Sequence, residues 1–442
     1  MPQATIRQDL RWLVAAAVLA RLVVPVVAWL THGSGAAFVY VDGPRYLELA
    51  GSLLHHARFA TSAGPEVFRV PGYPLWLALP VATGHPVVAN AIANACLGAV
   101  TVAVIYLSMR EIIGRQGARA AGWCCALDGT HVVFSGMVYA EPLLAAMVAI
   151  VASAGLSALR SRRPSWVLIA AAVAAASSYV KPAAILLGLW SAVSLAIPGR
   201  SRVTRIGLAL AGALAVAVVI PGMWILRNDR VVGFRGFSTQ IAAYAVYAAG
   251  AATEAEATST SFGDARERLR SAQGVPATAR SPSEWVTPGM GERFLRTFLE
   301  SPGALLQTQA RGVFETIAAS GADQLLLLLQ GREGHRLAKY ALRAMYLPVL
   351  GLALLGLLGV SSAVNRRERG WIASLLLYFL LVSGGPFGGA RFRVPMVPLI
   401  AMLAGIGYAG LAGFVGRHRS PRPATAAVNS PDAGAAISPR LS

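Results

Sequence analysis

The feature that most constrains the fold is a series of long apolar runs separated by short arginine clusters. A helix needs about 20 residues to cross about 30 Å of hydrocarbon, because each residue adds about 1.5 Å, and several runs reach that length. The 442 residues are 55% hydrophobic and 13% charged, with a mean hydropathy of +0.57, values typical of membrane proteins. We therefore predict an all-α polytopic membrane protein.

Run length predicts about ten transmembrane helices. They are expected near residues 12–30, 87–108, 118–135, 140–158, 166–180, 182–197, 205–225, 340–360, 371–383 and 394–415. As a single helix, the run 166–197 would be about 48 Å long, so two short spans with a turn at Ser177 to Pro182 fit better. The first run has no small-residue cleavage site and is expected to stay as an anchor.

The arginine clusters indicate the topology. They alternate with the predicted spans, so that all of them fall on one side, which the positive-inside rule makes cytoplasmic. The clusters are Arg7/Arg11, Arg110/Arg115/Arg119, Arg160/Arg162/Arg163, Arg200/Arg202/Arg205, Arg366/Arg367/Arg369 and Arg417/Arg419. The net charge of +19 is thus a topology signal rather than a nucleic-acid footprint. Both termini are expected in the cytoplasm, with the functional face turned to the periplasm or exterior.

Four regions follow from this topology. Residues 1–226 form an N-terminal transmembrane half that carries a first external loop, 31–86. Residues 227–339 are more polar and are expected to form short helices on the outer face, while 340–416 return to the membrane. Residues 417–442 are rich in Pro, Ser and Ala and are predicted to be a disordered cytoplasmic tail.

The first external loop contains the most informative polar residues. Asp42 lies just beyond the first span, where a partly desolvated carboxylate can act as a base; the alternative is a solvated acid in an Asp-Gly-Pro turn. Residues Arg45 to His56 read as an amphipathic helix on the membrane surface. Its predicted apolar face comprises Tyr46, Leu49, Ala50, Leu53 and Leu54.

Other ionisable residues meet the same outer face. Glu141 begins a span on the same side as Asp42, at a helix N-terminus where the dipole favours an acid. Lys181, one of two lysines, needs an anion such as a lipid phosphate if it is buried, or it snorkels outward. Arg227, Arg391 and Arg393 emerge at outer span ends, where a guanidinium can clamp a phosphate.

Metal and cysteine chemistry receive little support. Asp128 and His131 lie in an apolar span and read as structural, because Asp128-Gly129 can break a helix. The three cysteines all lie in apolar runs, which argues against disulfides or a thiolate cluster. We expect no required cofactor; a divalent metal is an alternative that no motif supports.

Several motifs together resemble a known family. They are Asp42-x-x-Arg45-Tyr46-x-Glu48, Pro71-Gly72-Tyr73-Pro74, Tyr139-Ala140-Glu141-Pro142-Leu143, Tyr179-Val180-Lys181-Pro182, Pro221-Gly222-Met223-Trp224-Ile225-Leu226-Arg227-Asn228 and Arg391-Phe392-Arg393-Val394-Pro395. In this order they resemble the C-type glycosyltransferases that use polyprenyl-phosphate sugars, the relatives of aminoarabinose transferase and the protein O-mannosyltransferases. The chain departs from the family pattern at Gly43, often a second acid, and at Val70, commonly a lysine.

The resemblance implies an inverting transfer of a sugar from a polyprenyl-phosphate donor to a glycan, lipid or protein acceptor on the outer face of a bacterial inner membrane. Asp42 would be the base and Glu141 the second carboxylate. The residues implied to bind substrate are Arg45, Tyr46, Arg69, Tyr73, Lys181, Arg227, Arg391 and Arg393.

Two other classes remain open. A transporter or flippase for lipid-linked sugars would bind the same phosphate without a base, although no internal repeat of the kind found in many transporters is visible. A non-catalytic subunit of an envelope assembly is the second alternative.

Overall fold

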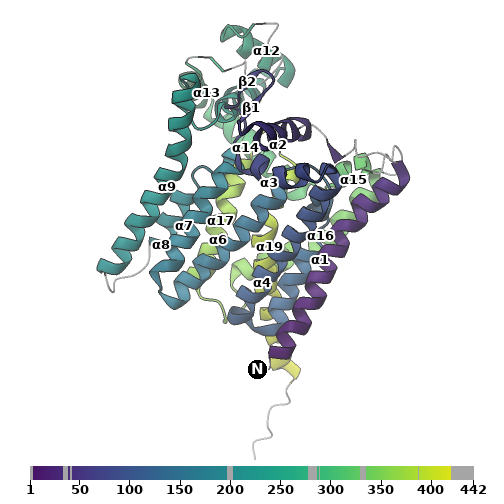
Figure 1. The fold of residues 1–442 in the computed structure, drawn as a ribbon. Helices are drawn as coiled ribbons and strands as arrows, with labels where there is room; N and C mark the ends of the chain where they lie inside the picture. Colours follow the sequence, from purple (N-terminus) through teal and green to yellow (C-terminus); the bar gives the residue numbers. More distant parts are fainter. Residues whose placement is uncertain are drawn as a thin grey trace, which may run out of the picture.

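The protein is a helical bundle with a layer of short elements at one end (Figure 1). The computed structural model describes residues 3–32, 38–39, 42–196, 203–276, 286–287, 289–328, 335–386 and 388–419, so the predicted disordered tail lies outside it from residue 420. The long helices are α1 (Gln3–His32), α4 (Pro86–Ala126), α6 (Glu141–Ser161), α9 (Val203–Val232), α16 (His335–Leu358), α17 (Arg366–Ser383) and α19 (Val397–Arg419).

Within the described residues, six helices are long and apolar enough to cross a membrane. They are Gln3–Leu30, Pro86–Ala126, Glu141–Ser161, Leu210–Val232, Lys339–Leu358 and Ala390–Val415, and shorter apolar helices cover Gly72–Ala82, Pro164–Tyr179 and Pro182–Leu195. The predicted fold class, an all-α polytopic membrane protein, is confirmed. The number of about ten spans stays a prediction, because length alone does not decide how the shorter helices sit in a bilayer.

Helix α4 is two helices that meet at Gly114, whose φ of 73° and ψ of −177° favour glycine. Arg21 of α1 contacts both halves. It packs against Gly98 in the first half and donates to the carbonyl oxygens of Cys125 (3.2 Å) and Ala126 (3.0 Å) in the second. The two halves therefore lie at the same depth, and the chain reverses at Gly114, as expected from the separate runs 87–108 and 118–135.

The second of these runs is not one continuous helix, which corrects the predicted span 118–135. Helix α4 ends at Ala126, and α5 (Gly129–Ser135) begins after a break. The fully buried Arg21 supplies donors for the terminal carbonyls of α4, and Asp128 caps α5 by accepting from the backbone N–H of His131 (2.8 Å). Asp128 thus has the helix-breaking role that the sequence favoured.

The predicted turn between 166–180 and 182–197 is present. Helix α7 (Pro164–Ala176) is followed by 3₁₀ turns at Ser177–Tyr179 and Pro182–Ala184 and then by α8 (Leu187–Ala196). Gly188 of α8 lies directly against Ala175 of α7, so the two short helices fold back on one another. The turn between them carries Lys181.

The outer layer comes from the first loop and from the polar segment. The loop forms α2 (Gly43–His56), β1 (Ala60–Thr61), β2 (Gly64–Pro65) and α3 (Gly72–Ala82), and the two-residue strands make a small antiparallel hairpin that the sequence did not indicate. The later elements are α10 (Thr239–Tyr244), a π-helical turn (Ala245–Gly250), α11 (Ala251–Thr258), α12 (Phe262–Ala272), α13 (Met290–Glu300), α14 (Pro302–Ala318), α15 (Ala322–Leu328), α18 (Ala390–Arg393) and a 3₁₀ turn (Val394–Met396).

Helix α2 rests on the bundle through Tyr46, Leu49 and Ala50, which are buried as predicted. Leu54, expected on the same face, is 40% exposed. The helix ends at His56, so its last turn projects beyond the bundle surface. Only the first part of the predicted face is therefore used for packing.

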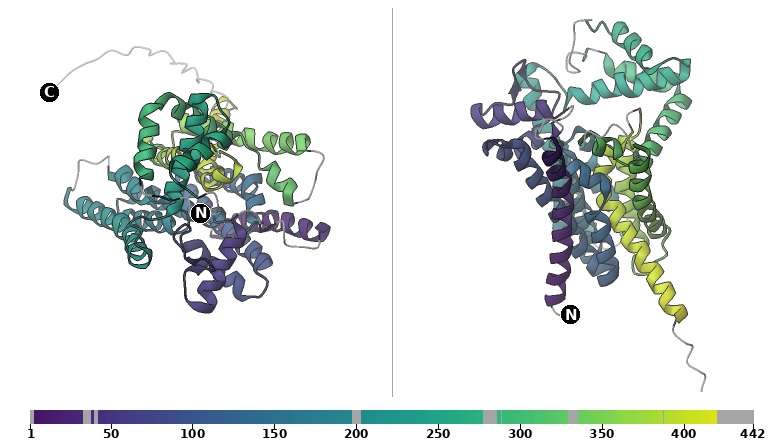
Figure 2. Two further views of the ribbon diagram at one scale, coloured as in Figure 1. Left: turned by 90° about the horizontal axis from the view of Figure 1, so that it is seen from above. Right: turned by 90° about the vertical axis from the view of Figure 1, so that its right-hand side faces the viewer.

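The opposite end of the bundle collects the arginine clusters. Asp9 pairs with Arg115 (2.8 Å) and Arg119 (3.8 Å), and Arg160 pairs with Glu368 (2.7 Å). The first residues of α1 and the last turns of α19 lie at this same end (Figure 2, right). The described clusters thus share one end, away from α2, α12 and α13.

Candidate active site

Asp42 stands where the outer layer meets the bundle. It occupies the N-cap position of α2, yet its side chain does not cap that helix. Instead, Oδ1 accepts from Arg69 and Oδ2 accepts from Arg391 at 2.6 Å. Burial acts to raise the pKa of Asp42, but the charges of Arg391 and Arg69 outweigh it and hold the pKa below its usual range. The carboxylate is therefore ionised and held by two guanidinium groups.

Glu141 is the first residue of α6 and is fully buried. Its Oε1 accepts from Nε of Arg391 (2.5 Å) and from Nζ of Lys181 (2.6 Å). Its Oε2 is also buried and has no hydrogen-bond partner among the residues that the structure describes. Arg391 thus bridges the two predicted acids, and one oxygen of Glu141 is left to receive a donor.

Aromatic rings support the three cations of this cluster. The guanidinium of Arg391 lies 4.1 Å from the ring centre of Tyr139, and Nζ of Lys181 lies 4.8 Å from that of Phe392. The guanidinium of Arg69 lies 5.2 Å from the ring centre of Tyr46. Such cation–π contacts hold a charged group in place while leaving its N–H donors free for anions.

The two predicted tyrosines pack behind the acids. Tyr46 and Tyr73 meet edge to face with ring centres 4.8 Å apart, and the Tyr73 hydroxyl donates to Asn90 (3.2 Å). Burial raises the pKa of Tyr46 to about 12, so its phenol stays protonated. Tyr46 therefore supports Arg69 directly, and Tyr73 packs against Tyr46.

A close backbone contact brings two motifs together. A Cβ at Gly72 would lie 2.6 Å from the carbonyl oxygen of Tyr179, so only glycine fits here. This contact sets the start of α3 against the turn that carries Lys181. The Pro-Gly-Tyr-Pro and Tyr-Val-Lys-Pro motifs are thus in direct contact.

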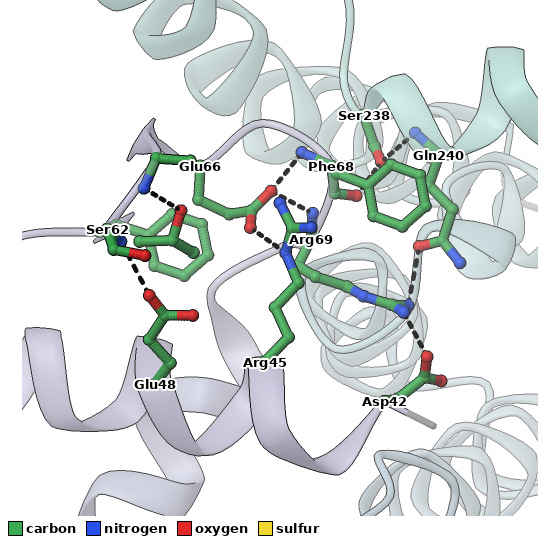
Figure 3. Close-up of polar contacts among 12 residues, drawn as sticks. Asp42, Arg45, Glu48, Ser62, Glu66, Phe68, Arg69, Ser238 and Gln240 are labelled. Atoms are coloured by element: carbon green, nitrogen blue, oxygen red, sulfur yellow. Dashed lines mark hydrogen bonds and ion pairs between the residues drawn. The ribbon is translucent and has the colours of Figure 1, made fainter. Parts of the chain in front are cut away.

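Glu66 organises the loop that positions Arg69, and sequence reasoning did not single it out (Figure 3). It is 1% exposed, and its Oε1 accepts from the backbone N–H groups of Phe68 (2.6 Å) and Arg69 (2.9 Å). Its Oε2 accepts from Nε of Arg45 (2.6 Å). Arg45, a predicted substrate ligand, therefore faces Glu66 and not Asp42. An acid three residues before a motif arginine was the signal available in the sequence.

Arg227, also predicted to bind substrate, holds the same loop from the other side. It donates to the carbonyl oxygens of Glu66 (2.7 Å) and Phe59 (3.1 Å), and its guanidinium lies 4.8 Å from the ring centre of Trp224. It also donates to Oδ1 of Asn228 (3.0 Å), and none of the contacts described for it is with the acidic pair.

The polar segment, residues 227–339, adds two residues that the sequence did not indicate, Ser238 and Gln240. Ser238 donates to the carbonyl oxygen of Phe68 (2.6 Å), and Oε1 of Gln240 accepts from Arg69 (3.4 Å) (Figure 3). The start of α10 therefore closes over the first loop. No local motif marks Gln240, because its role depends on a contact between distant segments.

Arg393 points away from this cluster. Its NH1 donates to the carbonyl oxygens of Ile317 (3.0 Å) and Ala319 (2.5 Å), its NH2 donates to Thr130, and its guanidinium lies over the ring of Tyr346. Only Phe392 separates it from Arg391 on the short helix α18, and side chains two positions apart on a helix point in different directions. The structure brings Arg391 to the acids and leaves Arg393 outside.

Charge in the central cluster is unbalanced. Among the described residues, the ion pairs of Arg69, Lys181 and Arg391 are with two carboxylates, Asp42 and Glu141, which leaves these five side chains with an excess of one positive charge. The described residues contain no group of three or more His, Cys, Asp or Glu side chains placed to hold a metal. Arg391 already fills the position between the two carboxylates, so the arrangement suits an anionic ligand.

The chain is similar to one protein family and to several solved structures. Residues 70–225 match the family model of dolichyl-phosphate-mannose-protein mannosyltransferases, whereas no curated protein matches. The archaeal oligosaccharyltransferase AglB from Archaeoglobus fulgidus, solved with an inhibitory peptide and a dolichol-phosphate, superposes with a TM-score of 0.50 at 11% identity, over 93% of this chain and 52% of that one. The resemblance to the C-type glycosyltransferases is confirmed.

The extent of this likeness differs between the two comparisons. The family match includes Lys181 and Glu141 and ends before Arg391, while the AglB likeness is one of fold. ArnT from Cupriavidus metallidurans bound to undecaprenyl phosphate matches at 14% identity over 90% of this chain and 77% of that one, with a TM-score of 0.39 that is too low to carry an argument. The chain spans about half the length of AglB.

Proposed function

We propose that the protein is a membrane glycosyltransferase that moves a sugar from a polyprenyl-phosphate donor to an acceptor hydroxyl or amine. The observation that carries this proposal is the bridge of Arg391 between Asp42 (2.6 Å) and Glu141 (2.5 Å), with Lys181 beside it. It combines a candidate base with cations for a leaving phosphate. The family match over residues 70–225 supports the same chemistry.

In the proposed reaction, the acceptor attacks the anomeric carbon and the bond from that carbon to the phosphate oxygen breaks. The acceptor proton passes to Asp42, and the phosphate leaves with the bonding electrons. Lys181 and Arg391 stabilise its developing charge, because cations fixed beside a leaving group lower the barrier. Direct displacement inverts the anomeric centre. No step requires a metal or another cofactor.

Donor binding would also free the base. Both oxygens of Asp42 are engaged by the guanidinium groups of Arg69 and Arg391. A phosphate monoester competes for these guanidinium groups, since it offers several charged oxygens in the geometry they prefer. When the guanidinium donors turn to phosphate, Asp42 becomes available to the acceptor.

The orientation follows from charge. The end of the bundle that holds Asp9, Arg115 and Arg160 carries the described arginine clusters, so the positive-inside rule supports a cytoplasmic location for it. Asp42 and its partners then face the periplasm or exterior of a bacterial inner membrane, where the acceptor is a glycan, lipid or protein.

The test is transfer by the purified protein. Wild-type protein given a polyprenyl-phosphate sugar and a panel of acceptors should release polyprenyl phosphate in step with glycosylated product, and Asp42→Asn should not. Mass spectrometry of envelope glycans and lipid-linked sugars, with and without the protein, identifies the physiological product. Donor movement across vesicles without product, unaffected by Asp42→Asn, would instead indicate a flippase.

A further inference from the structure

A second cavity lies beside the bundle, away from the acidic pair. It has a volume of about 320 Å³. Its walls come from the end of α4, the start of α5, α16 and α18. Leu127, Leu342 and Val349 give it an apolar wall, while Tyr346 and Arg393 stand at its polar end. A volume above about 300 Å³ with mostly apolar walls and a few polar groups is typical of ligand pockets.

Two buried polar atoms at the polar end of this cavity lack a hydrogen-bond partner among the described residues. They are the Tyr346 hydroxyl and Nε of Arg393, and the two residues are 9% and 2% exposed. The other contacts of Arg393 are neutral: the carbonyl oxygens of Ile317 and Ala319, and the hydroxyl of Thr130. A buried cation that contacts only neutral acceptors favours an anion nearby.

The surrounding charges also leave a positive excess. Asp128 lines the cavity, but its carboxylate caps α5 at the backbone N–H of His131 (2.8 Å). The fully buried Arg21 lies close by and donates to backbone carbonyls and to the His131 ring. Two buried arginines therefore share one carboxylate, an excess of one positive charge.

We propose that this cavity binds a phosphate-bearing membrane lipid, with the phosphate at Arg393 and Tyr346 and one chain along Leu342 and Val349. The rim supports entry from the bilayer, because Leu127 is 47% exposed and Met345 is 62% exposed on the apolar surface. Neither Asp42 nor Glu141 lines the cavity, so the lipid is bound without being transformed. The proposal does not depend on the glycosyltransferase activity.

The bound lipid would stabilise an otherwise weak point of the bundle. The cavity touches the break between α4 and α5, the α14–α15 link at Ser320, and α16. A phosphate paired with Arg393 would hold these segments together and compensate the excess charge. This assigns Arg393 a lipid-binding role in place of the donor contact that the sequence implied.

The test is native mass spectrometry of the delipidated full-length protein titrated with phosphatidylglycerol or with polyprenyl phosphate. Val349→Trp fills the apolar wall, and Tyr346→Phe removes only the unpaired hydroxyl. We expect Tyr346→Phe to weaken lipid binding by about 10-fold, the scale of one hydrogen bond to a charged group, and Val349→Trp to abolish it by filling the space for the chain. Leu354→Trp, on α16 but outside the cavity and 55% exposed, is the matched control and should bind as the wild type does.

The two lipids distinguish the source of the phosphate. Phosphatidylglycerol retained by wild type and lost in Val349→Trp supports a bilayer phospholipid, and the same pattern with polyprenyl phosphate alone supports the carrier. Lys181→Ala separates this cavity from the candidate active site, because it should leave phosphatidylglycerol binding unchanged while weakening any polyprenyl phosphate held at the active site. Equal retention in wild type, Val349→Trp and Tyr346→Phe, or no retained lipid in wild type, would overturn the proposal.

Discussion

Asp42 and Arg391 are 349 residues apart in the chain, and their side chains are joined by an ion pair of 2.6 Å. The first comes from the loop after the first span and the second from the start of the last one. Because Arg391 also contacts Glu141 at 2.5 Å, one guanidinium joins the first loop, α6 and the last span. The candidate active site is thus a property of the whole bundle.

Asp42→Asn should leave the protein folded and able to bind donor, yet lower transfer by about 10², the scale of losing a general base. The amide keeps the shape of the carboxylate but cannot take the acceptor proton. Turnover of a defined donor and donor binding should be measured on the same preparation. Near-normal turnover would reduce Asp42 to a turn residue.

Lys181→Ala and Arg391→Ala should each weaken donor binding by about 10-fold or more and lower turnover as well, because each removes a charge-assisted contact to the phosphate. Arg235→Ala is the control, since its side chain on the outer side is 87% exposed. Binding of polyprenyl-phosphate sugar to the purified variants is the measurement. Wild-type donor affinity in both Lys181→Ala and Arg391→Ala would show that other cations bind the phosphate.

Glu66→Gln should lower turnover by about 10-fold without abolishing donor binding, because the loop loses the charge that holds Arg69 and Arg45. Glu48→Gln is the matched control, as Glu48 accepts a backbone N–H from Ser62 (2.7 Å) in the same loop. Turnover and KM should be compared for both. An equal effect of the two substitutions would argue against a positioning role for Glu66.

The pH dependence of kcat/KM should reflect the two arginines that lower the pKa of Asp42. Arg391 and Arg69 hold its pKa below the usual range, so the base stays ionised, and its contribution to stability stays present, above about pH 4. The negative charge of Asp42 and its contribution to stability are both lost as the pH falls through this lowered pKa. Arg69→Gln removes one of these charges and should move the acid limb of kcat/KM to higher pH. A limb that stays in place, or moves lower, contradicts this electrostatic account.

The topology can be tested with single cysteines in a variant that lacks the native three. Ser62→Cys, exposed in the first loop, should react with an impermeant reagent in cells whose outer membrane, if present, is permeabilised. Ser362→Cys, exposed between α16 and α17, should react only after the inner membrane is opened. Reaction of both in sealed inner membranes contradicts the proposed orientation.

The sequence predicted the fold class well because a helix that crosses lipid needs an apolar run long enough to be recognised in the sequence. The turn around Lys181 was predictable from length for the same reason. The break at Asp128 and the β1–β2 hairpin were harder, because Arg21 and the loop contacts that stabilise them come from distant parts of the chain.

The site was partly predictable for a similar reason. Motif order and topology brought Asp42, Glu141, Lys181 and Arg391 to one face. They could not decide which way a side chain points. The two arginines of Arg391-Phe392-Arg393 look equivalent in sequence, and only packing separates them.

The bridge through Arg391 has a consequence for biogenesis. During synthesis, Asp42 and Glu141 enter the membrane early, whereas Arg391 emerges from the ribosome only as the final span begins. Until then, the acids have Lys181 and Arg69 but lack the cation that links them and gives the cluster its surplus positive charge. A chain that stalls before this point would have only one of the two cations proposed to bind the carrier phosphate, so we expect it to hold that phosphate less tightly than the finished protein does.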